Sequence, residues 1–180
     1  MFQQDALLPW KTCLENVQLG PVLRGTARFH ASKEARLWLE RVGLRGYEDR
    51  YPSQLSGGQR KRVAMAQALI NRPPILLMDE SFSALDVQTR ALMEDKLLEL
   101  WHDLRATVLF VTHDLEEAIA MADRVLLLTA GPYATIKADY PIHLPRPRNI
   151  AEVRFIPGFA EIYEAVWRSL KEEVMATYEQ

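Results

Sequence analysis

Apolar and polar positions along the chain follow two periods, one typical of amphipathic helices and one of short buried strands. Helices are expected after Ser32, after Gly57-Gly58, from Asp86, after Asp114 and from Phe159. Strands are expected at residues 75–78, 107–111 and 124–129. The first of these helices should end near Gly43, because glycine commonly follows a helix C-terminus.

The alternation of helices and strands predicts an α/β fold with a parallel sheet. The strand at 75–78 is continuously apolar, which is typical of strands buried on both faces, and residues 107–111 are expected to form another buried strand. Residues 1–30 are expected to be irregular, since proline and glycine interrupt them repeatedly. Residues 131–158 are expected to form a proline-containing connection to the last helix.

Composition narrows the class of protein. The 180 residues are 48% hydrophobic, enough to bury a core as one domain or most of one. A net charge of −2 provides no electrostatic attraction to nucleic acid. Cys13 is the single cysteine, so an internal disulfide is excluded and a cytoplasmic location is the simplest interpretation. No apolar run is long enough to span a membrane, so a role there requires docking onto an integral partner.

The sequence Leu-Ser-Gly-Gly-Gln at residues 55–59 carries the sharpest chemical signal. Ser56 and Gln59 have the spacing of a capping box. The two glycines allow close approach of the backbone, and a helix N-terminus attracts anions. Basic residues at 60–62 are expected to add positive charge. An ordinary capped helix after a glycine turn is the alternative interpretation.

Acidic and imidazole side chains follow two of the predicted strands. Asp79 and Glu80 end the first strand, and His113 comes after the next. Because ligands of open α/β sheets gather at the carboxyl ends of strands, these three side chains are expected in one crevice. Asp79 could bind Mg²⁺ and Glu80 could deprotonate a water. Asp86 alone predicts no more than an N-cap.

In this order and spacing the motifs resemble the ATP-binding subunits of ABC transporters. The matching segments are Gln3 with Leu7-Leu8-Pro9-Trp10 (Q-loop), 55–59 (signature), 75–80 (Walker B), 83–86 (D-loop) and His113 (H-loop). The resemblance implies a P-loop NTPase core with an incomplete parallel sheet and an α-helical subdomain. Within a partial ATPase domain of residues 1–180, it places that subdomain at about 4–62, the core at about 63–130 and a C-terminal extension at about 131–180.

The resemblance also implies a site shared by two ATPase subunits in a head-to-tail dimer, with ATP and Mg²⁺ as cofactors. Ser56, Gly57, Gly58 and Gln59 would contact the γ-phosphate of ATP held by the other subunit. Asp79 would bind Mg²⁺, Glu80 would polarise the attacking water, and His113 would touch the γ-phosphate. Gln3 would contact metal and water and relay closure to the membrane subunit. Asp86 would communicate across the dimer.

Partners and solute follow from the same resemblance. The importer types most similar are those for nitrate, aliphatic sulfonates or taurine, on the Leu7-Leu8-Pro9-Trp10 segment, the stretch at 144–148 and the terminal helix. We expect integral permease subunits as direct partners, a solute-binding protein as an indirect one and no nucleic acid. The location would be the cytoplasmic face of the cell membrane.

The sequence departs from the family at the phosphate-binding loop. It contains no Gly-x-x-x-x-Gly-Lys-Ser/Thr, and Gly20 and Gly25 are followed by Thr26-Ala27 instead. We therefore expect a chain truncated before the Q-loop, inactive as an ATPase alone, with a sheet edge and apolar surface uncovered. Ser81 replaces the usual proline, which is expected to loosen the turn after Glu80.

Two other functions stay open at this point. The chain could be a non-catalytic partner that lends its signature motif to a complete ATPase subunit. It could also be a soluble ABC-type ATPase acting on DNA or ribosomes, which the Q-loop segment and the near-neutral charge disfavour.

Overall fold

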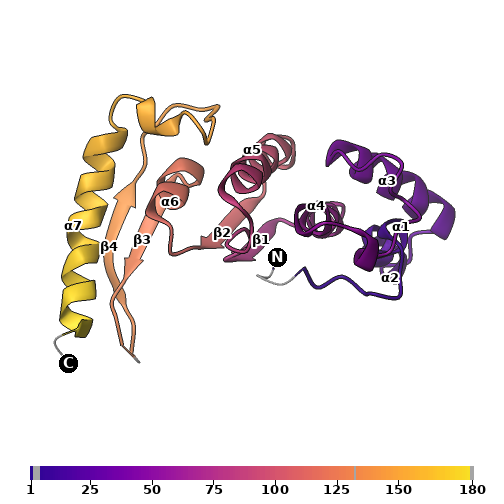
Figure 1. The fold of residues 1–180 in the computed structure, drawn as a ribbon, viewed down its shortest axis with the longest axis horizontal. Helices are drawn as coiled ribbons and strands as arrows, with labels where there is room; N and C mark the ends of the chain where they lie inside the picture. The colour runs from indigo at the N-terminus through magenta and orange to yellow at the C-terminus, as the bar shows by residue number, and fades with distance from the viewer. Residues whose placement is uncertain (2–4, 132, 179–180) are drawn as a thin grey trace. The chain divides into compact units, whose positions relative to one another are not determined.

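The computed structural model describes residues 1, 5–131 and 133–178. The chain divides into two compact units, Met1–Val111 and Thr112–Gln180, each of which is described by itself. Figure 1 labels their helices and strands. The predicted division near residues 62 and 130 stays a prediction.

The first unit begins with helices, of which α1 and α3 pack against α4. Their bounds are α1 Cys13–Val17, α2 Leu19–Leu23, α3 Arg28–Arg41, the 3₁₀ turn η1 Pro52–Gln54 and α4 Gly57–Leu69. The prediction of an irregular segment over residues 1–30 is therefore wrong for α1 and α2. Thr12 and Glu15 form a reciprocal capping box that starts α1, a local signal that the proline and glycine count obscured.

Helix α3 begins earlier than its pattern predicts. Ala27 is its N-cap, and Ser32 lies inside the helix, where its hydroxyl donates to Gln18 Oε1. The prediction of Ser32 as a cap is thus wrong. The predicted end holds, since α3 stops at Arg41 and Gly43 has a φ of +74°.

The parallel sheet consists of β1 (Ile75–Asp79) and β2 (Thr107–Val111), connected by α5 (Val87–Leu104). Leu76 and Met78 are buried on one face. The opposite face leaves Ile75, Leu77, Leu109 and Val111 between 52% and 61% exposed. Burial on both faces is therefore contradicted within the described residues, whereas the predicted uncovered apolar surface is present.

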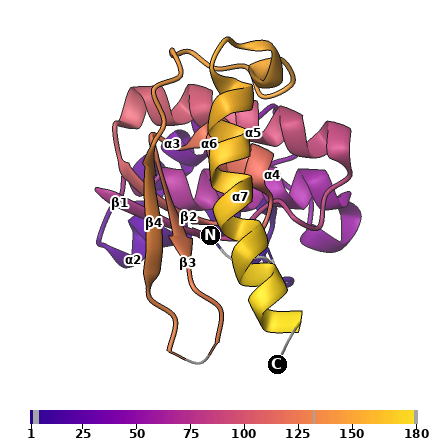
Figure 2. The ribbon, with the colours of Figure 1, turned by 90° about the vertical axis from the view of Figure 1, so that its left-hand side faces the viewer.

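The second unit combines helices with an antiparallel strand pair. Its elements are α6 Leu115–Met121, β3 Arg124–Leu128, β4 Ile136–Pro141, the 3₁₀ turn η2 Val153–Phe155 and α7 Phe159–Tyr178. β3 pairs antiparallel with β4, so its expected place in a parallel sheet is wrong. Residues 131–158 are likewise not a plain connection, because β4 lies within them. Figure 2 shows α7 running along the hairpin.

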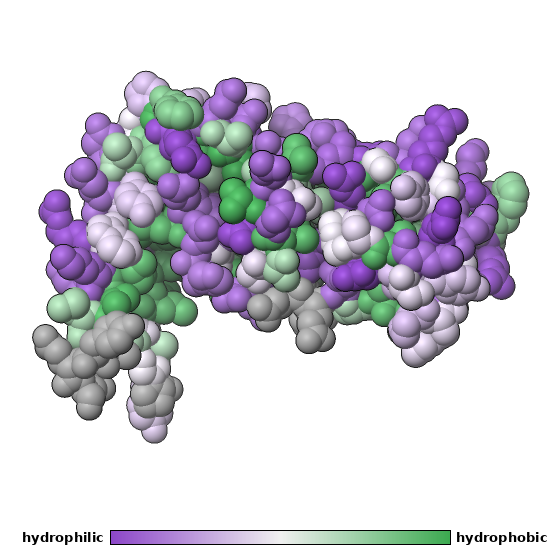
Figure 3. Space-filling view, viewed as in Figure 1, coloured by the Kyte–Doolittle hydropathy of each residue, from purple (hydrophilic) through white to green (hydrophobic). Residues whose placement is uncertain are grey.

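A separate core holds this unit together. It is built by Ile119 and Ala120 of α6, the loop residues Ile142 and Leu144, Val153, and Phe159 of α7. Some apolar surface stays uncovered, since Leu126, Leu128 and Ile136 of the hairpin are 42–61% exposed. Figure 3 shows hydrophobic surface over the hairpin and the lower part of α7.

Candidate nucleotide-binding site

The glycine turn at residues 55–59 has the geometry that its sequence predicts. Ser56 Oγ accepts the Gln59 backbone N–H at 3.3 Å, and Gln59 Oε1 accepts the Ser56 N–H at 2.9 Å. This reciprocal pair confirms the capping box at the start of α4. Gln59 Nε2 also donates to the Tyr47 hydroxyl at 3.3 Å, which fixes the amide orientation. Ser56 and Gly57 are exposed, so the turn is not buried in its own core.

Glycine is present at positions 57 and 58 for different physical reasons. A Cβ at Gly58 would lie 2.9 Å from Thr89 Cγ2, so the packing of α4 against α5 requires glycine there. A Cβ at Gly57 would meet no atom closer than 3.8 Å, at an Arg60 nitrogen. The packing of the described residues therefore gives no reason for glycine at Gly57. A ligand that approaches the exposed backbone closely would give one.

The positive charge after the turn is smaller than the sequence suggests. Lys61 is buried, with its side chain 3% exposed, and its Nζ lies 3.3 Å from Asp5 Oδ1. Arg60 Nε lies 3.2 Å from Asp5 Oδ2. The expectation that all three basic residues at 60–62 add positive charge at the turn is thus wrong for Lys61. The Asp5 carboxylate, which is 55 residues from Arg60 in the sequence, offsets positive charge that the sequence pattern alone counts in full.

The acidic pair lies at the carboxyl end of the parallel strands. Asp79 is exposed as the last residue of β1, and Glu80 follows with a φ of +40°. The Glu80 N–H donates to the Val111 carbonyl at 2.9 Å, and the Glu80 carbonyl accepts the Ser83 hydroxyl at 3.0 Å. A non-glycine residue in this conformation is strained, and such strain recurs at functional sites where surrounding bonds hold it.

Met1 extends the sheet on the side of β1 away from β2. Its amino group donates to the Leu77 carbonyl, and its carbonyl accepts the Asp79 N–H at 3.1 Å. The buried Ser81 hydroxyl donates to the same carbonyl at 3.2 Å. Desolvation, followed by the charge of Lys61, holds the pKa of the Met1 amino group below its usual value. Ser81 therefore ties the turn rather than loosening it, which corrects the expectation from sequence.

Asp86 is the N-cap of α5, as predicted from its position. Its Oδ1 accepts the Thr89 N–H at 3.0 Å, and this bond lowers the pKa of the Asp86 carboxyl. The side chain is exposed at the start of the helix. Its proposed role in communication between subunits stays a prediction.

His113 lies in the second unit, directly before α6. Asp114 caps that helix by accepting the Glu117 N–H at 3.1 Å, but the Glu117 carboxylate bonds the Thr112 hydroxyl instead of returning to Asp114. Half of the expected reciprocal cap is therefore present. Asp79 and Glu80 belong to the other unit, so their meeting with His113 in one crevice stays a prediction. Gln3 lies outside the described residues.

The described residues suit a magnesium ion that arrives with a phosphate ligand. Across the described part of the chain, no three His, Cys, Asp or Glu side chains gather as a metal site. Asp79 offers one exposed carboxylate at the strand end. Mg²⁺ is commonly bound by one or two carboxylates together with water and substrate phosphates, so this donor set fits Mg²⁺ bound with ATP.

Sequence comparison identifies proteins that are similar to this chain. A family model described as ABC transporter matches residues 1–83. An uncharacterized ABC transporter ATP-binding protein of Methanocaldococcus jannaschii is 44% identical over 175 residues, 97% of this chain and 64% of that protein. The aliphatic sulfonates import ATP-binding protein SsuB of Escherichia coli (strain K12) is 47% identical over 92% of this chain and 62% of its own length. A Brucella abortus protein named as ATP-binding is 41% identical over the whole chain and 68% of its own length.

Solved structures agree with this relationship. A dimeric ATP-binding cassette in a post-hydrolysis state, bound to ADP and Pi, matches with a TM-score of 0.64 and 32% identity over 79% of this chain and 62% of its own. A second dimeric structure of that bacterial ABC transporter cassette matches with a TM-score of 0.66. The fold is therefore that of the P-loop NTPase class, as predicted.

Within that class, the chain belongs to the family of ABC transporter ATP-binding proteins. It spans 62–64% of the length of the Methanocaldococcus and Escherichia relatives. Sequence reasoning found the motifs but missed Asp5, because its partners are distant in sequence. It also missed Thr89, whose contact with Gly58 depends on how α4 and α5 pack.

Proposed function

We propose that this chain acts as the ATP-binding and ATP-hydrolysing subunit of an ABC importer for a small solute such as a nitrate, an aliphatic sulfonate or taurine. The exposed, capped glycine turn carries this proposal, because it presents backbone N–H groups at a helix N-terminus with room for a phosphate. The importer assignment is supported by relatives named as aliphatic sulfonates import proteins. The dimeric cassette bound to ADP and Pi supports the nucleotide.

At the turn, Ser56, Gly57, Gly58 and Gln59 bind the γ-phosphate of ATP held by a second subunit. The N–H groups of Gly57 and Gly58 precede the first intrahelical bond, which Arg60 donates to the Ser56 carbonyl at 2.9 Å. They are thus oriented outward along the helix axis, and the helix dipole favours the anion they would meet. Asp86 on the neighbouring helix responds across the subunit interface.

At the strand end, Asp79 would hold Mg²⁺ together with the nucleotide, and Glu80 would orient and deprotonate the attacking water. The bonds from Glu80 to Val111 and Ser83 fix its backbone, so that its carboxylate can be positioned before ATP arrives. His113 contacts the γ-phosphate, and Gln3 contacts metal and water. Mg²⁺ held there with the nucleotide would supply positive charge to offset that of the phosphoryl group.

The isolated 180 residues are proposed to be inactive as an ATPase. They contain no Walker A sequence, and the Gly20–Gly25 spacing does not stand in for one. Gly20 lies within α2, where a Cβ would collide with the Asn71 side chain at 2.3 Å. Gly25 has a φ of +88° just after that helix. A nucleotide titration of the isolated chain is expected to show no micromolar affinity, and such affinity would overturn this part of the proposal.

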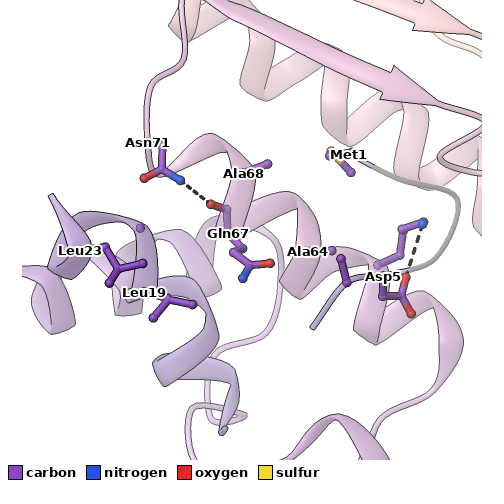
Figure 4. A pocket seen from close by; sticks show the side chains of 11 residues that line it. Met1, Asp5, Leu19, Leu23, Ala64, Gln67, Ala68 and Asn71 are labelled. Carbon is purple, nitrogen blue, oxygen red and sulfur yellow. Dashed lines mark hydrogen bonds and ion pairs between the residues drawn. The ribbon is translucent and has the colours of Figure 1, made fainter. Parts of the chain in front are cut away.

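The helical part of the first unit is the proposed docking region for the permease subunits. A cavity of about 330 Å³ lies there between α2, α4 and the first residues of the chain (Figure 4). Apolar Leu19, Leu23 and Ala64 line it together with polar Gln67 and Asn71. None of the helices, over the residues described, is both long and apolar enough to cross a bilayer. From the importer names of its relatives, we propose that the chain acts at the cytoplasmic face of the membrane, held by integral partners and linked through them to a solute-binding protein.

A mixed-subunit ATPase assay tests the proposed function. The chain would be combined with a complete ABC ATPase subunit whose own signature serine is replaced by arginine, so that ATP in that subunit requires the signature turn of this chain. Hydrolysis should appear on mixing. Gly57→Asp should lower it at least about 10²-fold, because a carboxylate would repel the γ-phosphate. Hydrolysis that never appears, or that Gly57→Asp leaves intact, would contradict a phosphate-binding turn.

A second experiment, on a complete domain that carries these residues after a Walker A segment, distinguishes the alternative, a non-catalytic partner that supplies only its signature motif. In that case Glu80→Gln in this chain has no effect, since the water is held by the complete subunit. If these residues instead catalyse hydrolysis when a Walker A segment precedes them, Glu80→Gln in that complete domain should lower the ATPase rate about 10²–10³-fold. Both outcomes are tested because the chain has an exposed signature turn and an acidic pair at a strand end but no Walker A sequence.

A further inference from the structure

Asp5 connects the start of the chain to the first turn of α4. Its two carboxylate oxygens contact different cations, Oδ1 with Lys61 Nζ at 3.3 Å and Oδ2 with Arg60 Nε at 3.2 Å. The Asp5 side chain is 23% exposed and the Lys61 side chain 3%. Figure 4 shows Asp5 at the edge of the cavity with its ion pair drawn. An ion pair this buried needs both members, because removing one leaves a charge without compensation.

Arg60 continues this connection to the glycine turn. While its Nε faces Asp5, its Nη1 donates to the Leu55 carbonyl at 2.8 Å. The Leu55 carbonyl belongs to the same planar peptide unit as the Ser56 N–H. That N–H closes the capping box by donating to Gln59 Oε1 at 2.9 Å. The orientation of this one peptide plane therefore depends on Arg60 from one side and on Gln59 from the other.

We propose that Asp5 is a positioning residue for the signature turn, acting through Arg60 on the Leu55–Ser56 peptide. The carboxylate restricts the guanidinium, and the guanidinium restricts the peptide plane that starts the turn. The inference rests on the proposed function in one respect, namely that the turn binds phosphate. Asp5 also lies two residues after Gln3 in the sequence, so a displacement of this segment would reach the turn through side chains of the same unit.

Two features separate this arrangement from a plain surface ion pair. Asp5 is bonded twice, so that the loss of one long side chain does not free it. Arg60 bonds a backbone carbonyl as well as a carboxylate, which makes its position specific. Other ion pairs of the unit, such as Arg45–Glu40 at 3.3 Å, join exposed side chains and bond no backbone of the turn. Pairs of that kind contribute little to structure.

Hydrogen exchange on the whole 180-residue chain, without nucleotide, tests the positioning role. Arg60→Met keeps the aliphatic stem and removes every donor, while leaving Asp5 paired with Lys61. The hydrogen-bonded amides of Leu55, Ser56 and Gln59 are expected to exchange about tenfold faster or more, because local opening of the turn becomes easier. Amides of β1 and β2 should keep their wild-type rates. The matched control is Arg62→Met on the same helix, which should leave the turn unchanged.

Asp5→Asn provides the second variant, and the double variant completes the cycle. Asp5→Asn should accelerate the same amides, and Asp5→Asn with Arg60→Met should be no faster than the quicker single variant, since both act on one connection. Additive effects, equal acceleration throughout residues 1–111, or an equal response to Arg62→Met would overturn the proposal. If Asp5→Asn fails to fold, Arg60→Met against Arg62→Met still decides it.

A kinetic arm separates failure of this inference from failure of the proposed function. In the mixed-subunit assay, Arg60→Met in this chain should lower the ATPase rate about tenfold, while Arg45→Met, which removes the exposed ion-pair partner of Glu40, should leave it unchanged. Faster exchange at the turn with unchanged hydrolysis would show that Asp5 positions a turn that does not bind phosphate. Unchanged exchange would sink the positioning role even if the mixed subunits hydrolyse ATP.

Discussion

The two strand pairs of this chain are stabilised in different ways. β1 and β2 are parallel, joined through the long helix α5, and packed on one face. β3 and β4 are antiparallel neighbours in sequence, and α7 contacts β3 and bonds β4 through the Tyr140 hydroxyl. Lys137 on β4 adds ties to α7 through Glu172 at 3.0 Å and Glu173 at 2.8 Å.

This difference shows which residues stabilise the strand pair of each unit. The second unit contains its own core and its own cross-links, so its hairpin is stabilised by residues of the same unit. The parallel pair presents a row of more than half-exposed apolar side chains, namely Ile75, Leu77, Leu109 and Val111. Surface of this kind is typical of an interaction site or of an aggregation hazard. The parallel sheet is therefore the part whose behaviour depends most on its surroundings.

The largest effect is expected from Arg148, which holds the second unit together from inside. Its guanidinium, 1% exposed as a side chain, donates to carbonyls of Ala122 at 2.6 Å and Leu144 at 3.0 Å, among others. Burial lowers the pKa of this group, and the nearby charge of Arg146 lowers it further. Arg148→Met leaves these carbonyls unsatisfied and should cost about 3 kcal/mol in the free energy of unfolding.

Hydrogen exchange of the β3 and β4 amides measures this loss in the second unit. Arg154→Met is the matched control, because that arginine is 55% exposed and should matter little. Cys13 reports on the first unit separately: it is buried, and burial raises the pKa of its thiol to about 11. Its alkylation rate should not change in Arg148→Met. A faster rate there would show that the two units do not unfold independently.

The same contrast explains what the sequence could predict. The N-caps Ser56 and Asp86 depend on residues three positions away, so local spacing located α4 and α5 correctly. The carboxyl-end position of Asp79 followed from the apolar run before it. Strand β4 was missed because its pairing with β3 is a tertiary contact and proline ends it.

Other contacts of the site could not be predicted from local sequence patterns. The pairing of Asp5 with Arg60 spans 55 positions, and no spacing rule connects them. Ser81 was expected to loosen its turn, because its bond to the Met1 carbonyl is visible only in three dimensions. The family resemblance supplied roles for Gln3 and His113 that the residues themselves did not establish.

A smaller effect is expected from the uncovered face of the parallel pair. Leu77→Thr should change the free energy of unfolding by less than about 0.5 kcal/mol, since the side chain is 61% exposed. Solubility, measured as the concentration at which the chain precipitates, should rise because less apolar surface is presented. Leu76→Thr, one residue away on the buried face, should instead cost about 2 kcal/mol. Equal costs for the two variants would contradict a sheet with one supported face.

The smallest effect concerns the exposed ion pairs of the second unit and their dependence on pH. Bonds from Lys137 and Ala130 lower the pKa of the Glu173 carboxyl below its ordinary 4.5, and Arg124 lowers that of Asp139 below 3.8. A carboxyl with a lowered pKa in the folded state stabilises it above the ordinary pKa, and this contribution is lost as pH falls through the lowered value. Lys137 behaves in the opposite sense, because its pKa is raised above 10.5 and its contribution is lost only above that range.

Denaturation of the second unit, followed from about pH 7 down to about pH 2, should therefore show a loss of stability in acid. Glu173→Gln should reduce this loss, and high salt should weaken it. An acid profile identical in wild type and Glu173→Gln would mean that the Glu173 carboxylate does not contribute, and that α7 is held to the hairpin by its other contacts, which include the Tyr140–Ser169 hydrogen bond at 2.7 Å.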